Sequence, residues 1–196
     1  MIEKIIKTID LLNKSVGHAF AWTIIVLILG VSYEVFMRYV LRDPTSWAFD
    51  LSYMLYGSLF LMAGAYTLSR NGHVRGDVFY RMWRPRVQAG LEMFLYFIFF
   101  FPGVLALVIA GWGYGTDAWK IHEVSVNSPA GVPVWPLKML LPVAGVLLTL
   151  QGIAEVLRCV LCLRDGHWPA RLHDVEELES VLQKARPATT GSGVAP

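Results

Sequence analysis

Four long stretches of the chain contain no Asp, Glu, Lys or Arg, and apolar side chains dominate each of them. They cover residues 15–33, 51–69, 93–116 and 139–154. A helix rises about 1.5 Å per residue, so about 20 residues cross the ~30 Å hydrocarbon core of a bilayer. Each stretch reaches this length when its flanking residues are included. The pattern predicts an all-α integral membrane protein with four transmembrane helices, spanning about residues 18–40, 47–69, 89–116 and 134–163.

The segments at the two ends of the chain have different patterns. In residues 1–17, isoleucine and leucine recur at helical spacing and the lysines lie elsewhere on the helix, at Lys4, Lys7 and Lys14. This pattern predicts an N-terminal amphipathic helix at the membrane interface. Residues 164–186 predict a tail helix, with Val175, Leu178 and Leu182 on one face, and residues 187–196 predict a disordered tail.

The positive charges favour one orientation in the membrane. Of the 17 Lys and Arg residues, 13 lie in the N-terminal segment, in the loop between the second and third spans, and at or after the C-terminal end of the fourth span. The other four are Arg38, Arg42, Lys120 and Lys138. Short cytoplasmic loops carry the excess of Lys and Arg, so we expect both termini to be cytoplasmic.

Composition agrees with a membrane protein and excludes two other classes. Apolar residues make up 55% of the chain and charged residues 16%. In soluble domains roughly a quarter of the residues are charged, and disordered chains contain far fewer apolar residues than this chain does. The net charge of +2 gives no reason to expect a nucleic-acid partner.

Two ionisable residues lie near the outer end of the first span. Glu34 and Arg38 are four residues apart and share one helix face. Charges inside a membrane are costly and therefore indicate a function by default. Three interpretations remain open: a structural pair that faces a partner helix, which we favour, a contact with a docking protein, or a path for substrate or ions.

Two further groups of polar residues flank the second span. Asp50 follows Trp47 by three residues, where a carboxylate either stabilises the helix N-terminus or takes part in subunit docking. At the inner end, His73, Arg75 and Asp77 predict a hydrogen-bonded network that holds the turn. A metal site needs three or four converging ligands, and this turn offers only two.

Other motifs give weaker signals. Cys159 and Cys162 lie at the inner end of the fourth span, where a reducing compartment and a helix C-terminus disfavour a reactive thiolate, so we interpret them as small packing residues. Gly111 and Gly115 permit close helix approach, and Pro102 predicts a kink in the third span. We find no motif for a catalytic site, a cofactor site or a metal site, and predict that the protein is not an enzyme.

A series of short motifs, in order along residues 30–160, resembles one family. In the first half these are Phe36-Met37-Arg38-Tyr39, Trp47 with an acid three residues later, Gly57, Gly64-Ala65 and His73-Val74-x-x-Asp77. In the second half they are Glu123-x-Ser125, Pro133-Val134-Trp135-Pro136, Lys138, Pro142 and Gln151-Gly152. Together they resemble the small membrane subunit of tripartite ATP-independent periplasmic (TRAP) transporters. The family usually has Glu where this chain has Asp50, and often Val where it has Gly76.

The resemblance implies a role in the bacterial inner membrane. In the family, a periplasmic binding protein captures a solute, usually an organic acid or acidic sugar. A large membrane subunit then carries the solute inward on a sodium gradient. The small subunit is a static scaffold, without a cofactor, that packs on the large subunit within the lipid and takes part in docking the binding protein. The solute itself is expected to be selected by the other two components.

Particular residues are assigned to these contacts as predictions. For subunit assembly and anchoring they are Glu34, Arg38, Trp47, Asp50, His73, Arg75, Asp77, Trp135 and Lys138. For docking of the binding protein, topology alone favours Arg42, Asp43, Lys120 and Glu123.

Two other functions compete with this one. A small multidrug-type exporter uses a glutamate inside its first span, but such proteins are much shorter and Glu34 lies too near the outer end. A membrane thiol oxidoreductase would use Cys159 and Cys162, which the predicted topology disfavours.

Overall fold

The computed structural model describes residues 2–72, 80 and 82–169. Six α-helices and two π-helical turns account for most of them: α1 Ile2–Ala21, α2 Thr23–Phe36, a π-helical turn Met37–Leu41, α3 Ala48–Ser69, α5 Pro85–Leu95, a π-helical turn Tyr96–Phe100, α6 Phe101–Lys120 and α7 Trp135–Asp165. Within these described residues the only strand-like pairing is an isolated antiparallel bridge between Val124 and Pro133.

Four helical runs are long and apolar enough to cross a membrane, which confirms the predicted number of spans. They are Ile2–Leu41, Ala48–Ser69, Pro85–Lys120 and Trp135–Asp165. The side of the membrane on which each end lies remains a prediction. His73, Arg75, Asp77 and the C-terminal segments 170–186 and 187–196 lie outside the described residues.

The first run differs from the expected division at residue 17. α1 continues to Ala21, and only Trp22 separates it from α2. No proline interrupts this segment, and Gly17 lies close against the Tyr66 side chain of α3. The helix therefore continues past the predicted boundary because it packs on a neighbour there. Its amphipathic contact with the membrane interface remains a prediction.

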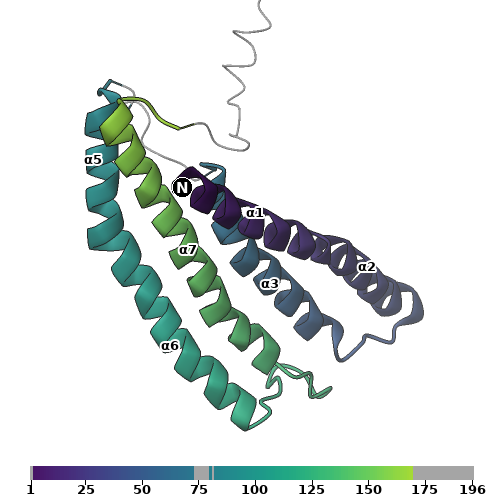
Figure 1. The fold of residues 1–196 in the computed structure, drawn as a ribbon. Coiled ribbons are helices and arrows are strands. Elements are labelled where there is room, and N and C mark those ends of the chain that lie inside the picture. The colour runs from purple at the N-terminus through teal and green to yellow at the C-terminus, as the bar shows by residue number, and fades with distance from the viewer. Residues whose placement is uncertain (1, 73–79, 81, 170–196) are drawn as a thin grey trace, which may run out of the picture.

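The helices form an open arrangement around α7 (Figure 1). α6 packs along one flank of α7 and α3 along another, while α1 crosses both α3 and α7. α2 packs on α3, and none of the α2 residues is buried. Much of the apolar surface of this chain therefore faces outward, as expected of a protein in a bilayer.

Glycine residues bring α6 and α7 together. A Cβ atom at Gly111 would lie 3.2 Å from the backbone nitrogen of Pro142, and one at Gly115 would lie 2.9 Å from the Met139 sulfur. The Gly-x-x-x-Gly spacing thus serves close helix approach, as its pattern predicts.

The third run is irregular where the sequence predicts a kink. The π-helical turn Tyr96–Phe100 directly precedes the α6 segment that contains Pro102. Proline lacks an N–H group, and its ring meets the carbonyl four residues earlier. A π-helical turn is one way in which a helix accommodates such a residue.

Candidate functional sites at the two ends of the helices

Asp50 joins the start of α3 to the loop between α6 and α7. Its carboxylate is fully buried and accepts hydrogen bonds from the Ser125 hydroxyl, at 2.6 Å, and from the Ser128 hydroxyl. The loop is also held by its own backbone, where the Ser125 N–H donates to the Val132 carbonyl at 2.8 Å. A hydrogen bond to a charged group contributes about 1.5–3 kcal/mol, so this contact holds the loop firmly.

A second contact holds the same loop on α7. The Lys138 ammonium donates to Glu123 at 2.6 Å and lies 4.1 Å from the centre of the Tyr114 ring on α6. Trp135, in the first turn of α7, packs on Trp119, with ring centres 5.1 Å apart. This ion pair joins Glu123, a residue predicted to dock the binding protein, to Lys138, a residue predicted to contact the large subunit.

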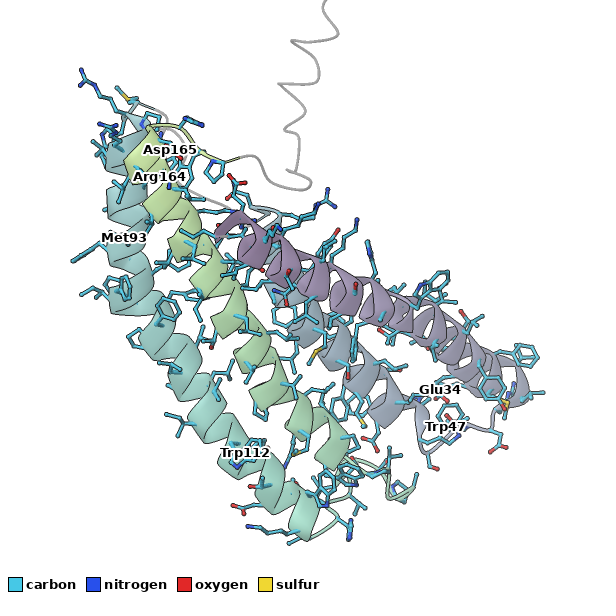
Figure 2. All side chains as sticks on the ribbon, in the orientation of Figure 1. Glu34, Trp47, Met93, Trp112, Arg164 and Asp165 are labelled. Carbon is cyan, nitrogen blue, oxygen red and sulfur yellow. The ribbon has the colours of Figure 1, made fainter. Side chains whose placement is uncertain are left out.

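The turn after the first run is held by Glu34 (Figure 2). One carboxylate oxygen of Glu34 accepts from Arg38, at 2.6 Å for Nη2, and the other accepts from the Thr45 backbone N–H at 3.0 Å. The Thr45 hydroxyl also donates to Glu34. Close by, the Trp47 ring stacks on Tyr33 with centres 6.1 Å apart. The predicted Glu34–Arg38 pair is therefore formed, and it binds the turn as well.

The remaining charged residues predicted to face outward are exposed. Lys120 pairs with Asp117 at 3.0 Å, and more than 70% of each side chain is exposed. Arg42 and Asp43 are exposed in the turn before Thr45. These three predicted docking residues are accessible to a partner, whereas Glu123 is largely engaged with Lys138.

A buried polar cluster joins α1 to α7. The Gln151 amide nitrogen donates to Asp10 at 3.0 Å and to Glu155 at 3.1 Å, and the Arg158 guanidinium donates to both carboxylates. The Asn13 amide donates to the Gln151 oxygen at 2.6 Å. Each of these five residues is at most 5% exposed. The sequence pattern did not predict this cluster, which forms a buried polar contact between α1 and α7.

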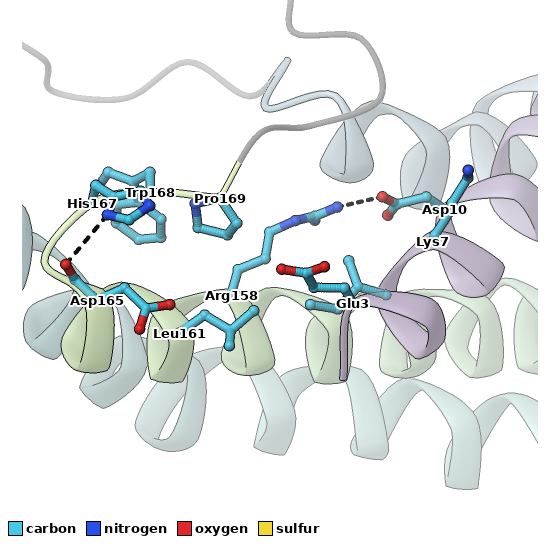
Figure 3. Close-up of a pocket in the computed structure, with 10 residues that line it drawn as sticks. Glu3, Lys7, Asp10, Arg158, Leu161, Asp165, His167, Trp168 and Pro169 are labelled. Atoms are coloured by element: carbon cyan, nitrogen blue, oxygen red, sulfur yellow. Dashed lines mark hydrogen bonds and ion pairs between the residues drawn. The ribbon is translucent and has the colours of Figure 1, made fainter. Parts of the chain in front are cut away.

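A cavity lies beside this cluster, between the start of α1 and the end of α7 (Figure 3). Its volume is about 570 Å³, and Glu3, Lys7, Asp165 and Trp168 line it together with the Arg158–Asp10 pair. Charges of both signs meet in this space. Across the part of the chain that the structure describes, no three His, Cys, Asp or Glu residues are placed to hold a metal ion.

Most of the chain matches one known family. Residues 27–162 match the family model described as tripartite ATP-independent periplasmic transporters, DctQ component. The chain belongs to this family. No curated protein matched the sequence. The matched DctQ region contains the Glu34 turn, the Asp50 contact and the α7 side of the buried cluster, whereas Asp10 and Asn13 precede it.

The DctQ family consists of transporter components. In this member, the two cysteines pack between helices. Cys159 and Cys162 are buried and pack with Ala89 of α5 and with Met93. The Cys162 thiol lies 3.5 Å from the Pro85 carbonyl. Both side chains therefore join α7 to α5, in keeping with the packing role that the sequence predicts.

Proposed function

We propose that this chain is a scaffold subunit that packs on and stabilises the large membrane subunit of a sodium-driven, binding-protein-dependent importer. The solute is an organic acid or a similar molecule, and the large subunit binds the sodium ion. The chain lies in the bacterial inner membrane with both termini cytoplasmic, and its outer loop and turn help to dock the periplasmic binding protein.

The observation that best supports this role is the internal use of the outer polar groups. Asp50, Glu34 and Lys138 each bind a segment that connects two helices, so these charged groups stabilise the fold of the subunit. The ion pairs of Arg38, Lys120, Lys138, Arg158 and Arg164 lie towards the ends of the helical runs. Such a distribution suits a rigid support better than a path for solute.

The Glu34 environment also argues against a multidrug-type exporter. An exporter of this kind needs a carboxylate that is available to substrate. Here Arg38 and Thr45 occupy both oxygens of Glu34. A thiol oxidoreductase likewise gains no support, because both cysteines are buried.

Affinity purification in mild detergent tests the proposal. From cells that produce the complete transporter, the tagged chain should bring down a much larger multi-span protein. Reconstituted alone in liposomes, it should show no uptake of labelled organic acids. Uptake by the isolated chain, or its consistent isolation as a homodimer alone, would contradict the scaffold role.

A further inference from the structure

A groove lies over α7, between α3 and α6, at the outer half of the helices. Its volume is about 340 Å³, and its walls include Gly57 and Leu61 of α3, Leu137 and Leu141 of α7 and Tyr114 of α6. Gly57 lets α3 approach α7 closely, since a Cβ atom there would lie 3.2 Å from the Leu137 side chain. α3 and α6 each pack on α7 and make no extensive contact with one another.

The outer end of the groove is closed by the loop. Residues 123–127 line it there, and the buried contact between Asp50 and Ser125 holds them in place. The Lys138 charge at this end is already neutralised by Glu123. Away from this end the walls are mainly apolar, so they suit an apolar occupant that lies within the bilayer.

The exposed face of α3 continues this groove. Phe49, Tyr56 and Phe60 are 65%, 61% and 70% exposed, and their spacing of seven and four residues places them on one helix face. Tyr53, which lies between them in sequence, lines the groove. By contrast, the exposed residues of α2 from Ile24 to Val31 are aliphatic. The exposed face of α3 is therefore aromatic, whereas that part of α2 exposes aliphatic side chains.

The Tyr56 hydroxyl on this aromatic face needs a hydrogen-bond acceptor. It is the ninth residue of α3, so its Cα lies about 12 Å along the helix from Ala48. Among the hydrogen bonds of the described residues, none involves the Tyr56 hydroxyl. A polar group in hydrocarbon is costly without a partner, and acyl chains offer no acceptor.

We propose that this groove and the adjoining face of α3 seat one transmembrane helix of the large subunit, and that this helix supplies an acceptor to Tyr56. The proposal rests on the proposed function and deepens it by naming the surface. Two helices that flank a third leave room for a fourth, whose side-chain ridges pack into both neighbours. Close packing and interhelical hydrogen bonds are the forces that associate helices in membranes.

Photo-crosslinking tests this surface. The photoreactive residue p-benzoylphenylalanine is placed at Phe60 or, as a matched control, at Leu29 of α2, which is 65% exposed. Irradiation of membranes that contain the complete transporter should attach the Phe60 variant to a protein of large-subunit size and should leave the Leu29 variant unattached to it. A protein adduct from Leu29 alone, or only a phospholipid adduct from Phe60, would overturn the proposal.

Affinity purification provides the second measurement. Tyr56→Phe keeps the ring and removes the hydroxyl, and an average interhelical hydrogen bond corresponds to about a threefold change in association. We expect about that loss of co-purified large subunit, a greater loss for Phe60→Ala and no change for Leu29→Ala. Equal recovery for all three would overturn the proposed seat. If the unaltered chain brings down no large subunit, the proposed function itself fails.

Discussion

Asp50 and Ser125 are 75 residues apart in the chain, and their side chains form a buried hydrogen bond of 2.6 Å. With Ser128, this contact makes the loop between α6 and α7 part of the helical framework. The loop is therefore positioned by α3, although it connects α6 to α7.

Substitution of Asp50 should loosen the loop and destabilise the subunit. Asp50→Ala leaves two buried or partly buried serine hydroxyls without their acceptor, at a cost of about 2–4 kcal/mol. We expect lower thermal stability in detergent and faster cleavage of residues 121–134 by proteinase K. Asp117→Ala, in an exposed ion pair, is the control and should change stability by less than about 1 kcal/mol. A loop as resistant in Asp50→Ala as in the native chain would contradict the assigned role.

Substitutions of Arg38 and Glu34 should differ in their effect on stability, although the two residues form one ion pair. The Arg38 side chain is 55% exposed, whereas that of Glu34 is 14% exposed and also binds Thr45. Arg38→Ala should weaken association with the large subunit but leave the turn in place. Glu34→Ala should lower the melting temperature further, because it releases the turn as well. Melting curves and co-purification yields of both variants check this order, and the reverse order would refute it.

Removal of Arg158 should destabilise the junction of α1 with α7. Arg158→Met leaves the Asp10 carboxylate buried without its cation, and breaking a buried pair in this way costs about 3–5 kcal/mol. The measurement is thermal unfolding in detergent. Arg164→Ala, at an exposed pair with Asp165, provides the matched control. The double variant Asp10→Asn, Arg158→Met should recover part of the loss, and no recovery would argue against charge as the cause.

The cysteine pair should be dispensable for transport. Replacing Cys159 and Cys162 by alanine removes two buried sulfur atoms and keeps the contact with Ala89 close to its present form. Solute uptake by the complete transporter should remain within about twofold of the native level, while stability falls by about 1–2 kcal/mol. Loss of uptake in a variant that retains normal complex yield would support a thiol function.

The number of spans was predictable because each needs a long charge-free stretch, and α3 begins and ends within one residue of the predicted range. The Glu34–Arg38 pair was predictable as well, since a spacing of four places both on one helix face. The contacts of Asp50 and Glu123 were not, because they join segments that only the tertiary fold brings together.

The sequence holds a pattern that is consistent with the buried cluster of α1. Gln151, Glu155 and Arg158 lie at spacings of four and three on one face of α7, and Asp10 and Asn13 are three residues apart on α1. The lysines and isoleucines of α1 predict a surface helix, and a polar face turned towards another helix is not distinguished from one turned towards water by periodicity alone.

The unequal lengths of the four helical runs link this subunit to the thickness of its bilayer. α3 has 22 residues, about 33 Å, whereas the first run has 40 residues, about 60 Å. Only α3 matches the hydrocarbon core when upright, so the longer helices must tilt or extend beyond it. Bilayer thickness therefore bears on how far each of the longer helices tilts or extends beyond the hydrocarbon core.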